Sequence, residues 1–317
     1  MPTLFEAALE NNIEFVKGNL NQISSIDERG KSLLHYAVLG SAVEVVELLL
    51  SRGISPNIKD SNGETPIFDC ARKAKLKIAK ILINNKANIN IENTRKETPL
   101  HLACHKGDLD FIKLLVENGS VVSKTLEGRL PIHYAILGGQ SVCLEYLINS
   151  SKDTWFQRDF QGNTLLHYAT RTTNPILVTF LLEKGLNVNA LNDQFETSLF
   201  NAVRYGNKEI INILLNFDAY ITIKNRRYET PLDIGQIFDQ LDNYKYLLEK
   251  KEEPTHSKLE EKQSLALAVF NRDHVMLRRL IDLNTPMKKD RYEKNALDYA
   301  KEYKFELCVS LLKDYHK

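Results

Sequence analysis

The stretch Thr98-Pro99-Leu100-His101-Leu102-Ala103 decides the fold of this chain, because close copies of it recur at a nearly constant interval. The copies begin at residues 32, 65, 98, 130, 164, 197 and 230, so successive intervals are 33, 33, 32, 34, 33 and 33 residues. Well-kept examples are Ser32-Leu33-Leu34-His35-Tyr36-Ala37 and Thr164-Leu165-Leu166-His167-Tyr168-Ala169. A period of this length predicts an array of small helical units, each of which buries its apolar face by stacking on its neighbours.

Each copy also carries the local signals of a helix pair. Threonine or serine supplies a helix N-cap, and proline at the first helical position gives up no hydrogen bond. Apolar residues then return at helical spacing, as they do in residues 43–50. Stretches such as Asp60-Ser61-Asn62-Gly63 hold turn-forming residues. The sequence therefore predicts a helix, a second helix and a protruding turn in every unit.

The phrase and its period resemble those of the ankyrin repeat, whose signature is T-P-L-H-x-A and whose period is 33 residues. Weaker copies at residues 263–268 and 295–300, and a truncated unit over residues 4–16, extend the resemblance to ten helix pairs across essentially the whole chain. The resemblance implies an all-α ankyrin-repeat solenoid with β-hairpin fingers, whose function is to bind another protein.

The pattern changes toward the C-terminus. Asp233 and Asp298 stand where the signature has histidine, and Gly235 stands where it has alanine. We expect ankyrin repeats with an N-terminal cap over residues 1–248, an irregular charged loop over 249–262, and divergent C-terminal repeats with a cap over 263–317. The alternative for residues 249–262 is a linker between two separate arrays. Divergence at the end is expected because terminal repeats cap the stack.

The composition of the chain sets no global preference for a charged partner. Its 317 residues are 43% hydrophobic and 26% charged, with a formal net charge of +1, as in an ordinary globular protein. It holds no apolar stretch of membrane-spanning length and no common export signal. We expect a cytoplasmic monomer that binds neither nucleic acid nor membrane, or alternatively an effector that acts in the cytoplasm of a host cell.

No catalytic or metal-binding motif stands out. The sequence lacks a phosphate-binding glycine loop and an H-E-x-x-H motif, and its four cysteines show no zinc-like spacing and are interpreted as reduced thiols. The resemblance makes the recurring histidines structural residues that bond within their own turn and to the next repeat: His35, His101, His133 and His167. We predict no enzymatic activity, cofactor or metal. The competing hypothesis is a ligand or enzymatic site in the divergent end, which contains His256 and His274.

In ankyrin repeats the two residues after the second alanine of the inner helix face the concave groove. These positions supply the predicted partner-binding residues Arg72, Lys73, His105, Lys106, Arg171, Arg204, Tyr205, Ile237, Phe238, Phe270 and Tyr303. The middle of the groove is expected to be basic and its C-terminal third apolar. We therefore expect a partner with an acidic surface or segment and an apolar anchor near Phe238 and Phe270.

Two alternatives to this groove remain open. The basic residues could be ordinary solvated surface, with their field partly offset by acids in the fingers, namely Asp60, Glu64, Glu97 and Asp193. The apolar residues could be covered by the segment around residues 249–262.

Overall fold

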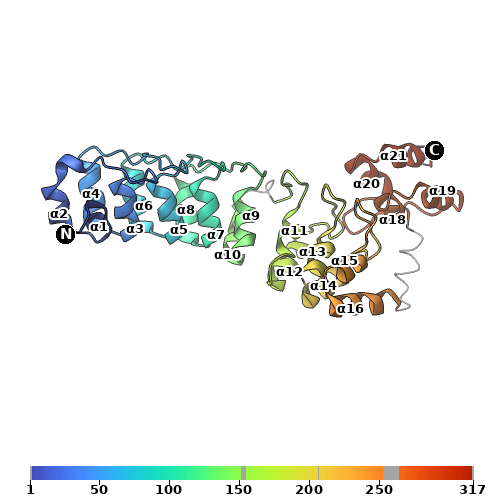
Figure 1. Ribbon diagram of the computed structural model, residues 1–317. Helices are drawn as coiled ribbons and strands as arrows, with labels where there is room; N and C mark the ends of the chain where they lie inside the picture. The colour runs from blue at the N-terminus through green and yellow to red at the C-terminus, as the bar shows by residue number, and fades with distance from the viewer. Residues whose placement is uncertain (1, 151–154, 206, 253–263, 316–317) are drawn as a thin grey trace. The chain divides into compact units, whose positions relative to one another are not determined.

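The computed structural model describes residues 2–150, 155–205, 207–252 and 264–315. In these residues the chain forms helices joined by turns, which confirms the predicted all-α repeat architecture. The chain divides into two compact units, Met1–Phe160 and Gln161–Lys317, called here the first and the second unit. Figure 1 shows the helix labels used below.

In the first unit the inner helices of successive repeats pack against one another, α1 on α3, α3 on α5, α5 on α7 and α7 on α9. The outer helices form a second row, with α2 on α4, α4 on α6 and α8 on α10. The helices are α1 (Leu4–Leu9), α2 (Ile13–Gly18), η1 (Leu20–Gln22), α3 (Leu33–Gly40), α4 (Val43–Ser51), α5 (Pro66–Lys73), α6 (Leu76–Asn84), α7 (Pro99–Lys106), α8 (Leu109–Glu117), α9 (Pro131–Leu137) and α10 (Ser141–Ser150).

Small residues let the inner helices approach one another closely. Ala103 and Cys104 of α7 are fully buried. At the end of α3, a Cβ atom added to Gly40 would lie 1.7 Å from the carbonyl oxygen of Leu9, so the backbones of α1 and α3 meet at a distance that only glycine permits.

The turns between repeats, called fingers below, are held by one recurring device. Asp60 Oδ1 accepts hydrogen bonds from the N–H groups of Asn62 and Glu64, both at 2.9 Å. Equivalent bonds are made by Asp27, Asn93, Asn192, Asn225 and Asp290. Ser61 N–H joins one finger to the carbonyl of Arg29 in the previous one, at 2.9 Å. The described residues contain an isolated bridge but no named strand, so the fingers are short turns, each closed by a backbone hydrogen bond such as Asp60 N–H to Glu64 O at 2.8 Å and by these side-chain bonds.

The second unit repeats this packing, with α11 on α13, α13 on α15 and α12 on α14. Its helices are α11 (Leu165–Ala169), α12 (Pro175–Glu183), α13 (Ser198–Arg204), α14 (Lys208–Asn216), α15 (Pro231–Ile237), α16 (Leu241–Glu252), α18 (Leu265–Phe270), α19 (His274–Asp282), α20 (Ala296–Glu302) and α21 (Glu306–Tyr315). Residues 249–252, expected in the charged loop, continue α16. Residues 253–262 of that predicted loop lie outside the described residues.

The helices α18 to α21, called here the C-terminal block, do not continue the stack of inner helices that ends at α15. Within the described residues the main helix contacts of α18 are with α19 and α20 rather than with α15. The block instead lies on the fingers of the second unit (Figure 1). The Tyr292 hydroxyl accepts a hydrogen bond from Val188 N–H at 2.9 Å, and the Tyr303 hydroxyl accepts one from Leu191 N–H at 3.0 Å. The last repeats therefore form part of the second unit by folding back onto its turns.

Candidate functional site

The recurring histidines are structural. His35 Nδ1 accepts hydrogen bonds from the N–H and hydroxyl of Ser32, at 3.1 and 3.0 Å. Its Nε2 therefore carries the proton and donates to the carbonyl of Glu64 in the next repeat, at 3.2 Å. His101 and His167 make the same bonds. Burial lowers the pKa of His101 to about 4, so the ring is neutral at physiological pH.

Replacement of the signature histidine changes which group accepts the hydrogen bonds of the capping residue at the start of the inner helix. Where aspartate replaces it, the carboxylate takes over, since Asp233 accepts from both the N–H and the hydroxyl of Thr230 at 2.7 Å. Where phenylalanine replaces it, at positions 68 and 200, no acceptor remains. The hydroxyls of Thr65 and Thr197 are then buried without a hydrogen-bond partner in the described part of the chain. The divergence at Asp233 is therefore a working cap.

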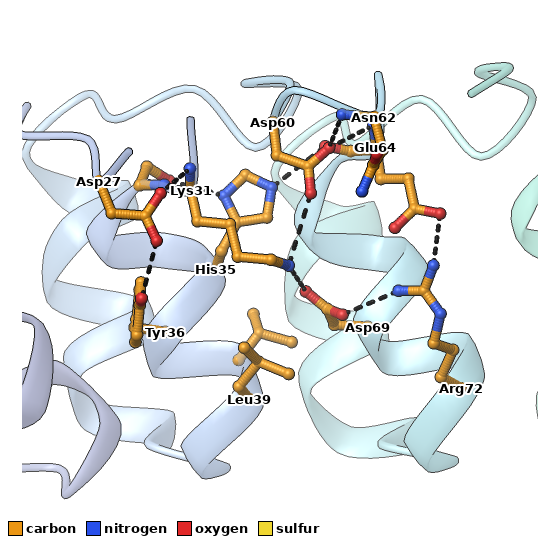
Figure 2. Close-up of polar contacts among 12 residues, drawn as sticks. Asp27, Lys31, His35, Tyr36, Leu39, Asp60, Asn62, Glu64, Asp69 and Arg72 are labelled. Atoms are coloured by element: carbon orange, nitrogen blue, oxygen red, sulfur yellow. Dashed lines mark hydrogen bonds and ion pairs between the residues drawn. The ribbon is translucent and has the colours of Figure 1, made fainter. Parts of the chain in front are cut away.

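The predicted basic residue Arg72 belongs to a charge network between two repeats of the first unit, which Figure 2 shows. Its guanidinium pairs with Asp69 at 3.0 Å and with Glu64. Lys31, from the preceding finger, lies 3.3 Å from Asp69 and 3.5 Å from Asp60. Burial opposes ionisation of Arg72, but the two carboxylates outweigh it and raise the pKa of its guanidinium. The charge of Arg72 is neutralised within the protein.

The network continues into the next repeats. Asn93 Nδ2 donates to Glu64 at 3.1 Å and to Glu97 at 2.8 Å, and the Tyr134 hydroxyl donates to Glu97 at 2.6 Å. Burial alone would raise the pKa of Glu97, but the hydrogen bonds from Tyr134 and Asn93 and the charge of Arg95 outweigh it and lower that pKa. Glu64 and Glu97 therefore join neighbouring repeats through hydrogen bonds, in addition to reducing the positive charge of the groove.

The other basic residues predicted in the first unit are solvated. Lys73 ends α5, and His105 and Lys106 end α7; all three side chains are exposed. Of the residues expected to make the centre of the groove basic, the first unit therefore offers Lys73 and Lys106 as cations open to solvent.

In the second unit the same inner-helix positions build two arginine–aromatic pairs. The guanidinium of Arg171 lies 5.5 Å from the ring centroid of Tyr205, one repeat further on. The guanidinium of Arg204 lies 5.3 Å from the ring of Phe238, again one repeat further on. Ile237 precedes Phe238 at the end of α15. These five residues form what is called here the inner-helix patch.

The two arginines of the patch differ in their partners. Arg204 makes two parallel bonds to the carboxylate of Glu196, at 2.8 and 3.2 Å, and a third to Asn201 Oδ1 at 2.9 Å. Arg171 is exposed, and the described residues give it no carboxylate partner. Arg171 is therefore the cation of the patch that is open to an external carboxylate.

Two predicted groove residues are not available to a partner in the way expected. Phe270 is 1% exposed, packs against Tyr299 with ring centroids 4.7 Å apart, and forms part of the core of the C-terminal block. Tyr303 is partly buried, and its hydroxyl holds the 187–191 loop through Leu191 N–H. The prediction of an apolar anchor at Phe270 is wrong, because folding back of the last repeats buries that ring. Exposed Ile237 and Phe238 remain.

The divergent end offers little acid–base chemistry. His256 lies outside the described residues. His274 Nδ1 lies 3.5 Å from the Sγ atom of Cys308, and burial raises the pKa of that thiol to about 11, so it is protonated at neutral pH. Within the described ranges no group of three metal-ligating side chains occurs, and no helix there combines the length and apolarity needed to cross a membrane.

Comparison with known families agrees with the repeat geometry. The family model described as ankyrin repeats (3 copies) matches residues 4–93, 85–158, 100–192, 140–225 and 166–258. The chain belongs to the ankyrin-repeat family. Its fold resembles that of the human ASB11 ankyrin repeat domain, with a TM-score of 0.62 and 24% sequence identity, over 71% of this chain and 100% of that one.

Curated relatives of this ankyrin-repeat chain match it over shorter stretches. The putative ankyrin repeat protein FPV031 of Fowlpox virus is 40% identical over 79 residues, 23% of this chain and 23% of that protein. The palmitoyltransferase AKR1 of Lachancea kluyveri is 28% identical over 123 residues, 38% of this chain and 17% of that protein. The putative ankyrin repeat protein R664 of Acanthamoeba polyphaga mimivirus is 29% identical over 107 residues, 32% of this chain and 66% of that protein. The matched regions thus cover about a sixth to two thirds of these relatives.

The ion pairs of Arg72 and Arg204 correspond to a fixed Glu–Arg spacing in the sequence, which is not seen when the groove positions are considered one at a time. Glu64 precedes Arg72 by eight residues, and Glu196 precedes Arg204 by eight residues. In both ankyrin repeats the glutamate ends a finger and the arginine lies in the last turn of the following inner helix. Spacing repeated in this way indicates an ion pair within the repeat.

Proposed function

We propose that this ankyrin-repeat protein is a protein-binding scaffold whose second unit engages its partner through the inner-helix patch. The observation that carries the proposal is the exposure of its large apolar side chains. Tyr205 is 52% exposed, Ile237 58% and Phe238 47%, on two successive repeats. Neighbouring apolar side chains left in water on a folded surface are typical of interaction sites. Tyrosine, phenylalanine and arginine are also enriched among residues that dominate binding energy.

The charges of the patch support a partner with an acidic residue beside an apolar one. Arg171 is open to a carboxylate, and its stacking on Tyr205 holds the guanidinium in place. Arg204 is engaged by Glu196, so its role is to support the ring of Phe238. The acidic group of the partner would therefore bind at the Arg171 end and its apolar group at the Ile237 end.

The test compares two substitutions of exposed apolar residues. Ile237→Asp removes the anchor of the patch, whereas Val275→Asp, on α19, changes a side chain that is 81% exposed and lies outside the patch. We expect Ile237→Asp to weaken capture of partner proteins, measured by affinity capture with quantitative mass spectrometry, by at least about tenfold. Val275→Asp should leave capture unchanged. Equal capture by both variants and the unmodified protein would contradict the proposal.

The electrostatic part has its own variant. Arg171→Glu should weaken capture of the same partners and reduce the dependence of capture on salt, because one charge contact is lost. Arg72 and Arg204 are unsuitable for charge reversal, since reversal would place two carboxylates together inside the protein. If Arg171→Glu leaves both capture and its salt dependence unchanged, the partner is apolar but not acidic.

The four cysteines are all buried and free of disulfides. A protein with such thiols suits a reducing compartment, which supports a cytoplasmic location in the producing cell or in a host cell. Fractionation of producing and exposed host cells, with detection of the protein in each fraction, distinguishes the two.

A further inference from the structure

A second surface of interest lies on the fingers of the second unit, away from the inner-helix ends. There two guanidinium groups lie over the ring of Phe195. That of Arg226 is 4.7 Å from the ring centroid, and that of Arg272 is 4.2 Å from it. Arg272 also lies 5.8 Å from the ring of Tyr228. Arg226 and Tyr228 belong to one finger, whereas Arg272 comes from the turn between α18 and α19. The two cations meet because the C-terminal block folds back.

Arg272 is held without a compensating carboxylate in the described structure. Its guanidinium donates to the carbonyls of Lys224 at 3.0 Å and Asn225 at 3.1 Å. Burial lowers the pKa of Arg272, and the charge of Arg226 lowers it further. A partly desolvated guanidinium beside a second one is stabilised by any anion that binds between or above them.

The carboxylates on the same elements are engaged elsewhere. Glu229 accepts a hydrogen bond from Asn225 Nδ2 at 2.9 Å. Asp273 caps α19 by accepting from Met276 N–H at 2.9 Å. Arg226 Nε donates to the finger of Asp193, but to its backbone carbonyl rather than its carboxylate. The positive charge of Arg226 and Arg272 is therefore not cancelled locally by these acids.

Tyr228 adds an observation that is independent of charge. Its φ is +63°, a left-handed value that this finger position also takes with Gly63 and Gly128, at +75° and +78°, and with the non-glycine residues Lys96 and Phe195, at +58° and +59°. A tyrosine in this conformation is strained relative to glycine. Its side chain is 73% exposed, so internal packing does not account for an aromatic residue at this position.

We propose that Arg226, Arg272 and Tyr228 form a second binding surface, whose partner is an acidic segment of another protein. The carboxylates of that segment bind the two guanidinium groups, and its neighbouring side chains pack on the ring of Tyr228. A protein segment is favoured over nucleic acid, because two guanidinium groups in a chain of net charge +1 do not supply the extended basic track that a phosphate backbone requires. This surface is distinct from the inner-helix patch.

The test uses the full chain and a fluorescein-labelled oligoglutamate peptide, with binding measured by fluorescence anisotropy at low salt. Arg226→Gln should weaken binding about tenfold, the effect of losing one charge-assisted contact. Arg278→Gln, at an exposed position of α19, is the matched control and should change binding less than twofold, by about the scatter expected of a surface substitution.

Tyr228→Gly separates binding from folding. Because glycine relieves the positive φ, this variant should unfold at a higher temperature than the unmodified protein while binding oligoglutamate more weakly. A merely structural role for Tyr228 predicts that stability and binding change in the same direction.

Three results would overturn the proposal. The first is oligoglutamate binding that Arg226→Gln and Arg278→Gln affect equally. The second is binding that Arg171→Glu abolishes while Arg226→Gln leaves it unchanged, which would place the anion site on the inner-helix patch. The third is tighter binding of an oligothymidylate than of oligoglutamate, which would make the partner a nucleic acid. Failure of the inner-helix patch in partner capture leaves this peptide assay unaffected, so the two proposals fail separately.

Discussion

Acidification from about pH 8 to about pH 5 should destabilise the first unit through His101 and His133. Both side chains are fully buried between repeats, and burial lowers the pKa of each to about 4. In the unfolded chain their pKa returns to the ordinary value of 6.5. Because the folded state binds fewer protons than the unfolded state, stability is complete above about pH 6.5 and falls as the pH drops toward 4.

The magnitude follows from the two pKa values. At pH 5 a histidine with a folded pKa of about 4 and an unfolded pKa of 6.5 loses about 2 kcal/mol of stabilisation. The two residues together therefore account for about 4 kcal/mol, a large share of the stability of a typical domain. Glu97 does not confound this window, because its pKa is lowered below its ordinary value of 4.5 and it stays ionised.

The assay is urea unfolding at each pH, followed by pulsed hydrogen exchange read on peptides from α7 and α9. The variant His101→Gln cannot titrate, so it should unfold more easily at pH 8 but lose about half as much additional stability on acidification. A denaturation midpoint that stays constant from pH 8 to pH 5 would refute the argument. So would an unchanged pH dependence in His101→Gln.

Three further substitutions test the packing of the repeats. Gly40→Ala places a Cβ atom 1.7 Å from Leu9 O and should lower the free energy of unfolding by at least about 2 kcal/mol in urea denaturation, whereas Gly18→Ala, with no atom within 4 Å, should be tolerated. Asp233→Ala removes a helix cap and should lower that free energy by about 1 kcal/mol, with Asp233→Asn losing less. Phe270→Ala leaves a cavity in the core of the C-terminal block and should lower the free energy of unfolding by about 3–5 kcal/mol. Its specific sign is loss of hydrogen-exchange protection in α18 and α20. Unchanged protection in those helices would contradict the burial of the Phe270 ring.

The repeat architecture was predictable because its determinants are local. A cap, a proline and a histidine within six residues, all present in residues 98–103, specify the start of an inner helix, and the contacts of the histidine reach only to the next repeat. The same signals persist in altered form at Asp233, where a carboxylate accepts the bonds that histidine accepts elsewhere. Stacking of identical units then follows from the apolar stripe on each helix.

The places of Arg72 and Arg171 near the ends of their inner helices were also predictable, but their ion pairing was not. Arg72 and Arg171 occupy equivalent places in their repeats, yet Arg72 is paired with two carboxylates and Arg171 has none in the described residues. The difference depends on finger residues such as Glu64, whose side chains turn back toward the inner helix. Ion pairing of this kind depends on side-chain direction as well as on spacing.

The sequence alone specifies that this protein is an array of ankyrin repeats. That the last repeats leave the row and pack on the fingers follows from contacts that arise only in the folded chain. That step buries Phe270 and places Arg272 beside a finger that contains Asn225, 47 residues earlier in the chain. The physical reason is that these contacts join aromatic rings, tyrosine hydroxyls and backbone groups far apart in sequence, and no periodic pattern specifies them.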